Sequence, residues 1–194
     1  IRTGIALAKT YGAELIGLTV EVTNPEFNTL VPNLQDAVEQ RAQEALKSFV
    51  EETGGKAKTA IRESADPAHG IAAAARELSA DIIVMGQHGK GVISRLLFAD
   101  TAAKVIGQAD CPVLVAPRAA WLWEKRILLA TDGSERGAAA ERAAAQLAAR
   151  FKLPITVVSV VTNSNSEEER AEARQAVDAA VARLAGLGLQ AEGK

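Results

Sequence analysis

Short apolar runs rich in β-branched residues alternate with longer segments of helical period along this chain. Such runs predict strands, and several are nearly continuous in apolar residues, as burial on both faces of a sheet requires. The predicted strands cover residues 15–20, 57–61, 81–85, 112–115, 126–130 and 155–160. Their alternation with helical segments indicates βαβ units and a parallel sheet.

The intervening segments place apolar residues three and four positions apart, which is the spacing of an amphipathic helix. The clearest examples are Val38, Ala42, Ala45 and Phe49, and Ala173, Val177, Ala180, Val181 and Leu184. Two helix starts carry local signals as well. Asp66 precedes Pro67 as an N-cap before a first-turn proline, and Ser166 is followed by Glu169 at capping-box spacing. Both signals predict where a helix begins.

The chain repeats itself when Leu7 is placed on Leu147. The matching positions are Ala8 with Ala148, Tyr11 with Phe151, Leu15 with Ile155, Leu18 with Val158, Thr19 with Ser159 and Val20 with Val160. Two copies of one module are therefore predicted, residues 1–117 and 125–194, joined by an aperiodic linker at 118–124. The first copy has no counterpart of strand 126–130, and the second has none of the elements after residue 54. Both copies are expected to be incomplete.

The composition, 48% hydrophobic and 24% charged, is that of a globular protein. With 22 basic and 24 acidic residues the net charge is −2, which provides no basic field for a phosphate backbone, so no nucleic-acid partner is expected. No apolar run approaches the roughly 18 residues that span a bilayer, so no membrane association is expected either. Cys111 is the single cysteine and stands outside any zinc-ligand spacing, which fits a cytoplasmic protein.

Several of these segments resemble the universal stress protein family. Its C-terminal half is matched by the run Asp-Ile-Ile-Val-Met-Gly-Gln-His-Gly-Lys-Gly at 81–91 and by Cys-Pro-Val-Leu-Val at 111–115, in family order and spacing. The run Arg-Ile-Leu-Leu-Ala-Thr-Asp-Gly-Ser at 126–134 is similar to the opening strand and loop of the family. Together with the repeat, the resemblance extends over nearly the whole chain.

The resemblance implies an α/β fold with an open, parallel, five-stranded sheet in the order 3-2-1-4-5. This fold is Rossmann-like, of the adenine nucleotide alpha hydrolase-like type, and here it is expected as a tandem repeat. In the family a nucleotide, when bound, lies at the carboxyl ends of strands 1 and 4. That position agrees with the general rule for open α/β sheets, in which the crevice forms where the strand order switches.

Nucleotide-binding members carry a loop of the form G-x2-G-x9-G-S/T after strand 4, whose glycines let backbone N–H groups approach phosphate oxygens. Gly86 and Gly89 match its first two positions, whereas Ala99 and Asp100 replace the third glycine and the hydroxyl residue. A carboxylate within about 4 Å of a phosphate costs roughly 1 kcal/mol in bulk water and about 4 kcal/mol at an effective dielectric of 20. The groups that would offset this repulsion between Asp100 and a phosphate are the Thr101 hydroxyl or a bridging Mg²⁺.

The remaining ligand positions implied by the resemblance are divided between the copies. Thr131 and Asp132 match the acidic loop after strand 1 that contacts the nucleoside. The residues that match the ends of strands 2 and 4 are Val20, Val160, Met85 and His88. No single copy holds a whole site. One hypothesis is that strand 126–130 fills the vacant first-strand position of copy one and unites Asp132 with the glycines of residues 86–89.

Ordinary structural roles compete with each of these assignments. The glycines after residue 85 are also typical of a strand-to-helix turn, and the Thr-Asp-Gly-Ser sequence at 131–134 is a good turn and N-cap in any βα unit. His88 is accompanied by no serine or cysteine nucleophile motif, so a backbone role in the loop is favoured over catalysis.

The function that the resemblance implies is that of a universal stress protein, a non-catalytic stress-response module that binds ATP or AMP, with or without Mg²⁺. The first alternative is an ATP-binding protein with slow ATP hydrolysis. The second is a nucleotide-free dimerisation and interaction scaffold, which Ala99 and Asp100 favour. The resemblance also implies pairing through the edge of strand 112–115, either as an internal pseudo-dimer or as a homodimer, because an unpaired edge strand needs cover.

Overall fold

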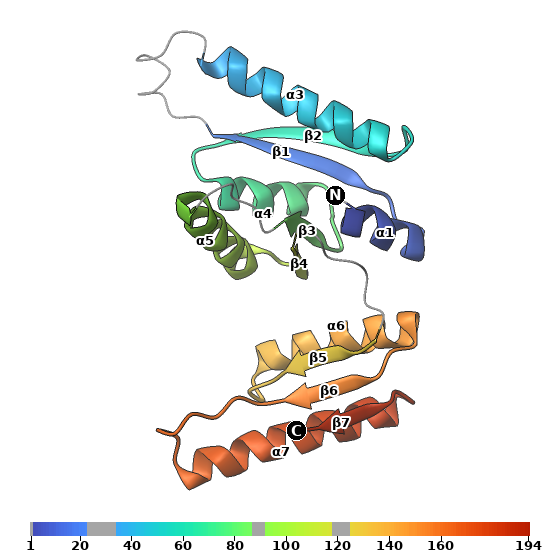
Figure 1. Cartoon of the computed structure of the whole chain (residues 1–194), viewed down its shortest axis with the longest axis vertical. Helices are drawn as coiled ribbons and strands as arrows, with labels where there is room; N and C mark the ends of the chain where they lie inside the picture. Colours follow the sequence, from blue (N-terminus) through green and yellow to red (C-terminus); the bar gives the residue numbers. More distant parts are fainter. Residues whose placement is uncertain (1, 23–33, 87–91, 118–124) are drawn as a thin grey trace. The chain divides into compact units, whose positions relative to one another are not determined.

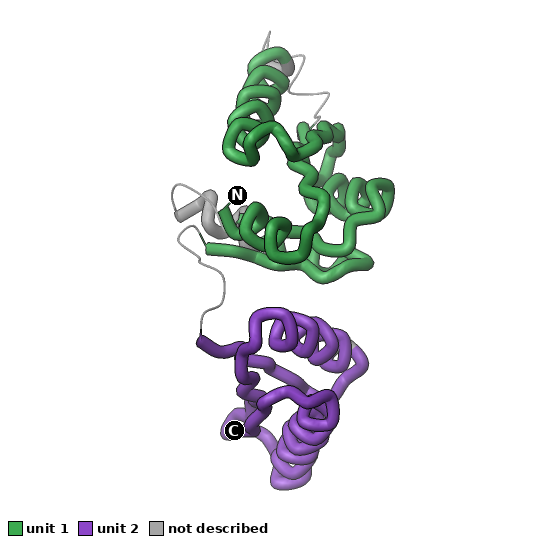
Figure 2. Tube along the Cα trace, turned by 90° about the vertical axis from the view of Figure 1, so that its right-hand side faces the viewer, with its two compact units in different colours: residues 1–122 green, residues 123–194 purple. Residues whose placement is uncertain are grey.

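The computed structural model describes residues 2–22, 34–86, 92–117 and 125–194, which divide into two compact units (Figure 2). Unit 1, Ile1–Leu122, contains α1 (Arg2–Tyr11), β1 (Ile16–Val22), α3 (Leu34–Glu52), β2 (Lys58–Ser64), α4 (Pro67–Glu77), β3 (Ile83–Gly86), α5 (Val92–Gln108) and β4 (Val113–Ala116). Unit 2, Trp123–Lys194, contains β5 (Ile127–Ala130), α6 (Glu135–Phe151), β6 (Ile155–Val158), α7 (Glu167–Gly186) and β7 (Ala191–Gly193). Figure 1 shows these elements along the chain.

The strands of unit 1 form two separate parallel pairs in the part of the chain that the structure describes. β1 pairs with β2 from Ile16 opposite Lys58 to Val22 opposite Ser64. β3 pairs with β4 in the same sense, with Gly86 opposite Ala116 at the carboxyl end. The β1–β2 pair is therefore continuous over seven residues of each strand, whereas the β3–β4 pair is short.

Helices cover both faces of the β1–β2 pair. A Cβ atom at Gly17 of β1 would lie 2.5 Å from the ring of Phe49, so this face of the strand meets α3. A Cβ atom at Gly70 of α4 would lie 2.8 Å from a methyl group of Val20, so the opposite face meets α4. Since successive strand residues point to opposite faces, Thr19 and Glu21 share the α3 face with Gly17.

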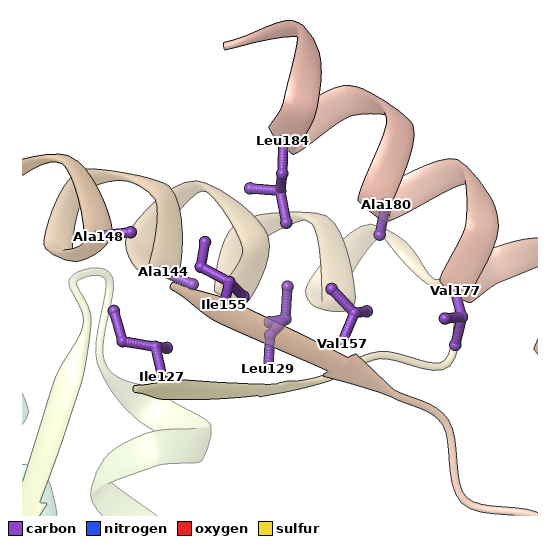
Figure 3. Packing of buried hydrophobic residues seen from close by; sticks show 9 residues of the cluster. All are labelled: Ile127, Leu129, Ala144, Ala148, Ile155, Val157, Val177, Ala180 and Leu184. Atoms are coloured by element: carbon purple, nitrogen blue, oxygen red, sulfur yellow. The ribbon is translucent and has the colours of Figure 1, made fainter. Parts of the chain in front are cut away.

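Unit 2 has one sheet, in which β5, β6 and β7 pair in that order and in parallel. Ile127 and Leu129 of β5 are buried while Leu128 between them is 68% exposed, because only one face of the strand meets the helices. Figure 3 shows the side chains of β5 and β6 facing those of α6 and α7. The buried members of this core are Ile127, Leu129, Ala144, Ala148, Ile155, Val157, Val177, Ala180 and Leu184.

The helix starts follow the local signals in the sequence. The Asp66 carboxylate accepts a hydrogen bond from the Ala68 N–H at 3.0 Å, with Pro67 in the first turn of α4. Ser166 and Glu169 form the complete capping box of α7, each side chain accepting from the other residue's backbone N–H. The predicted N-cap and capping box are therefore confirmed.

The α/β class, the parallel pairing and the equivalence of the two copies are confirmed. Each copy contains a helix followed by a strand, a second helix and a second parallel strand, namely α1–β1–α3–β2 and α6–β6–α7–β7. Each pair of strands that lie side by side in the structure is also an adjacent pair in the order 3-2-1-4-5. No described sheet contains five strands, so the complete order stays a prediction. β7 was not predicted, because the sequence Ala-Glu-Gly has no strand signal. Residues 118–124, the predicted linker, lie outside the described residues.

The composite hypothesis is wrong. Among the described strands β5 pairs only with β6, from Ile127 opposite Ile155 to Ala130 opposite Val158, and β3 pairs only with β4. β5 belongs to unit 2, because α6 connects it directly along the chain to its parallel neighbour β6.

Within the described ranges, no helix combines the length and apolar character that crossing a membrane requires.

Candidate functional site

The turn between β5 and α6 is fixed by its own hydrogen bonds. The Thr131 hydroxyl accepts from the Gly133 N–H at 3.2 Å, and the Asp132 carboxylate accepts from the Ser134 N–H at 2.9 Å. Ser134 then caps α6 by accepting from the Gly137 N–H at 3.1 Å. Gly133 has a φ of 77°, a conformation that glycine adopts without strain. The loop at the carboxyl end of β5 is therefore a preformed turn.

Two neighbouring side chains of this turn differ in what they offer to a ligand. Thr131 is buried, whereas Asp132 is exposed. Hydrogen bonds from the Ser134 side chain and backbone hold the pKa of the Asp132 carboxyl below its usual range, so it is ionised at neutral pH. A Cβ atom at Gly137 would lie 3.0 Å from this carboxylate, so the glycine lets the first turn of α6 approach it. The result is an exposed anionic acceptor beside a helix start.

Val160 lies at the same edge of the sheet as Asp132. β5 and β6 are parallel, and the Thr131 N–H donates to the Val158 carbonyl at 2.9 Å just where both strands end. Val160 follows two residues later and is 83% exposed. The structure thus brings together the residues of unit 2 that the resemblance assigns to the ends of strands 1 and 2.

In unit 1 the corresponding positions belong to different strand pairs. Val20 is in β1 and faces α4, whereas Met85 and Gly86 end β3. Met85 is half-buried and Gly86 is exposed. The structure therefore places these residues at the carboxyl ends of strands that are not paired with each other. His88 and Gly89 lie outside the described residues.

The last part of the expected phosphate loop lies inside a helix. Ala99, Asp100 and Thr101 are interior positions of α5. The Asp100 carboxylate pairs with the Lys104 ammonium at 2.8 Å, one helical turn away, and this hydrogen bond raises the pKa of Lys104. An N–H in a helix interior donates to the carbonyl four residues earlier, so it is not directed at a phosphate. This geometry differs from a glycine loop that precedes a helix.

A further polar residue at a strand end was missed by the sequence reading. Glu21, next to Val20 in β1, is only 8% exposed. Its Oε1 atom has no hydrogen-bond partner among the described residues. The available signal was a charged residue inside the apolar run Leu-Thr-Val-Glu-Val.

In the described ranges, no group of three or more His, Cys, Asp or Glu side chains is arranged to hold a metal ion.

The fold class defined by these elements is an α/β protein with parallel strands and a tandem repeat, and exposed loops follow β5 and β6 at their carboxyl ends. The sequence profile of the Universal stress protein family matches residues 1–117 and again 124–191. The chain therefore belongs to the universal stress protein family, with two family regions in tandem.

Two relatives about one third identical in sequence carry the same family name. The chain is 34% identical over 121 residues to a universal stress protein of Methanocaldococcus jannaschii, in a match covering 59% of this chain and 71% of that protein. A universal stress protein of Synechocystis is 34% identical over 113 residues, which cover 57% of this chain and 71% of the relative.

Solved structures resemble the fold at low identity. The structure of a universal stress protein from Archaeoglobus fulgidus matches with a TM-score of 0.71 at 14% identity, over 98% of this chain and 69% of that one. A functionally unknown protein of Pseudomonas aeruginosa matches with a TM-score of 0.60 at 20% identity, over 100% of this chain and 67% of that one. Likeness at this identity concerns the fold alone.

Proposed function

We propose that this chain is a non-catalytic stress-response module that binds an adenine nucleotide, ATP or AMP, at the carboxyl ends of its parallel strands. The observation that carries the proposal is the β5–α6 turn, in which an exposed, ionised Asp132 stands beside the start of α6. A carboxylate there accepts hydrogen bonds from the hydroxyl or amino groups of a nucleoside.

The chemistry of the turn favours binding over catalysis. Asp132 is held in its ionised form by the hydrogen bonds from Ser134, so its role is that of a hydrogen-bond acceptor rather than of a proton donor at neutral pH. Backbone groups at the ends of β5 and β6, near Val160, complete the surface against which an adenine would lie. Mg²⁺ would act with the phosphates of the nucleotide rather than with a protein cage.

Calorimetric titration of the complete chain with ATP and with AMP, each with and without Mg²⁺, tests the proposal. Saturable micromolar binding is expected, whereas no heat at millimolar nucleotide would overturn it. Release of phosphate during prolonged incubation with ATP would instead support the slow-hydrolysis alternative. The variant Asp132→Asn should bind about tenfold more weakly, since hydrogen bonds to a charged group contribute about 1.5 kcal/mol or more. Asp178→Asn, at an exposed position of α7, is the matched control.

A second candidate, the nucleotide-free interaction scaffold, is favoured by a specific observation. Asp100 is ion-paired to Lys104 within α5, in the segment where a phosphate-binding member needs free backbone N–H groups at a helix start. The double variant Ala99→Gly and Asp100→Ser restores the family pattern. A gain in ATP affinity would show that these residues limit phosphate binding, and unchanged affinity would show that they do not.

The scaffold candidate includes dimerisation of two chains through the edge of β4. Among the described strands β4 has a partner on one side only, and an unpaired edge is stabilised when another strand covers it. Sedimentation velocity of the complete chain distinguishes a homodimer from a monomer. Slow hydrogen exchange along residues 113–116 in the associated species would locate the pairing, and fast exchange there would place the contact elsewhere.

A further inference from the structure

The loop between β6 and α7 begins at the carboxyl end of β6, the same edge of the sheet that carries Asp132. Residues 160–164 of this loop are all exposed, so packing against the core does not determine their conformation. The chain continues past the end of β6 before it turns back into α7 (Figure 1). The shape of the loop therefore depends on its hydrogen bonds.

Two side chains hold this loop in one conformation. The Arg170 guanidinium, near the start of α7, donates to the Thr162 carbonyl at 2.9 Å and to the Asn165 carbonyl at 3.3 Å. The Asn165 side-chain oxygen accepts from the Thr162 N–H at 2.6 Å and from the Thr162 hydroxyl at 2.9 Å. Hydrogen bonds from a charged donor are stronger than those between neutral groups. Arg170 is therefore the residue that ties the loop to α7.

The same helix contacts the other loop of the candidate site. A Cβ atom at Gly133, next to Asp132 in the β5–α6 turn, would lie 3.2 Å from the Cβ atom of Ala176. Val177, the residue after Ala176, belongs to the buried core, so this part of α7 is fixed against the sheet. Six residues of one helix, about 9 Å along its axis, separate the two contacts. α7 therefore links the loops that follow β5 and β6.

We infer that Arg170 is a positioning residue of the nucleotide site in unit 2. By tying Thr162 to α7, it holds the backbone near Val160 at a fixed place relative to Asp132. This inference rests on the proposed nucleotide binding and adds the residue that shapes the adenine side of the site. A loop that is ordered before the ligand arrives loses less conformational entropy on binding, and the affinity is higher for that reason.

The test is calorimetric titration of four full-length proteins with AMP and with ATP. Arg170→Gln removes the charged donor and should weaken binding of both nucleotides by the same factor, about tenfold, because the loop lies against the part that they share. Arg170→Lys keeps a charged donor for one carbonyl and should bind only about threefold more weakly. Arg174→Gln removes the same charge one helical turn later, at an exposed position, and should leave both affinities unchanged.

Three results would overturn the inference and leave the proposed function standing. The first is unchanged affinity of a folded Arg170→Gln protein, and the second is an Arg170→Lys protein that binds no better than Arg170→Gln. The third is a larger loss for ATP than for AMP, or an equal loss in Arg174→Gln, since either would mean that the positive charge acts on the phosphates. No binding of AMP or ATP by the unaltered chain overturns both the inference and the proposed function.

Hydrogen exchange of the unaltered chain keeps the inference falsifiable if the Arg170 variants do not fold. The Thr162 amide should exchange slowly, because it donates to Asn165 in a turn that Arg170 holds in place. Exchange of this amide at the rate of an unstructured peptide would show that the loop is not held, and would overturn the inference.

Discussion

The two units use the same helix–strand repeat but differ in how their strands are joined into sheets. In unit 2 three strands form one sheet, and its core includes Ile155 and Leu184, both fully buried. In unit 1 the described strands form two separate pairs. The apolar side chains known to be buried there, among the residues whose burial is described, are mostly alanines, namely Ala42, Ala68, Ala72, Ala74 and Ala116, with Leu7, Leu46 and Val105. Larger buried side chains remove more apolar surface from water, so the buried side chains described for unit 2 contribute more per residue than those described for unit 1.

The element that makes this difference is β5. It pairs with β6, supplies Ile127 and Leu129 to the core, and leads into the capped turn at Asp132. No described strand of unit 1 plays this part, since β1 has β2 on one side and no strand on the other. In unit 2 the opening strand therefore adds a third strand to the sheet and leads into the candidate site.

The largest effect is expected from emptying the core of unit 2. Leu184→Ala should lower the free energy of unfolding of this unit by about 3 kcal/mol, because a fully buried leucine leaves a cavity. Leu187→Ala, at a 69% exposed position three residues later, should change it by less than about 0.5 kcal/mol. Urea unfolding followed by peptide-resolved hydrogen exchange measures both. Equal effects of the two substitutions would refute the proposed core.

A slightly smaller effect is expected from crowding the helix–strand contact of unit 1. Gly70→Ala should destabilise this unit by about 2 kcal/mol, because the new methyl group would lie within 2.9 Å of both Val20 and Ser64 side chains. Gly107→Ala places a methyl group in open space near the end of α5 and should be neutral or stabilising by up to about 1 kcal/mol. Amide hydrogen-exchange rates in β1 measure this change in the stability of unit 1. A stable Gly70→Ala protein would mean that α4 does not hold the β1–β2 pair closely.

The next effect concerns the ion pair between the two helices of unit 2. Arg183 donates two hydrogen bonds, at 2.9 and 2.8 Å, to the Glu141 carboxylate, which is largely buried. Arg183→Leu should cost about 1 to 2 kcal/mol, since it leaves that carboxylate without its donor. Adding Glu141→Leu should recover most of the loss, because no charge then remains buried. A double-mutant cycle by urea unfolding measures the coupling, and strictly additive effects would argue against the pair.

The smallest effect is the acid dependence of the α7 capping box. The backbone hydrogen bond from Ser166 lowers the pKa of Glu169 in the folded state, so its stabilisation is complete at neutral pH. It is lost as the pH falls through the folded-state pKa, because the folded state must then bind a proton that it disfavours. Glu169→Gln should flatten the acid limb of the stability curve, whereas Glu168→Gln, an exposed neighbour, should leave it unchanged. An identical acid limb in both variants would contradict this role.

Local patterns predicted much of what the structure contains. Apolar periodicity located every described strand except β7 within a few residues, and Asp66 and Ser166 marked two helix starts, because these signals depend on neighbours along the chain. The turn at Thr131 and Asp132 was found through its resemblance to a family motif. The helix around Asp100 agrees with the helical spacing of the apolar residues within 98–106 in the sequence, whereas the glycine spacing of the family motif does not specify where a helix begins.

The sequence by itself determined the α/β class and the turn at the end of β5, since both depend on residues close together in the chain. It also determined the tandem repeat, because the two copies share the same order of residues. Only the tertiary structure decided that β5 pairs with β6 rather than completing unit 1. It alone also distinguished the buried Glu21 from the exposed Glu63. Strand partners and burial depend on contacts between residues far apart in sequence, so periodicity cannot determine them.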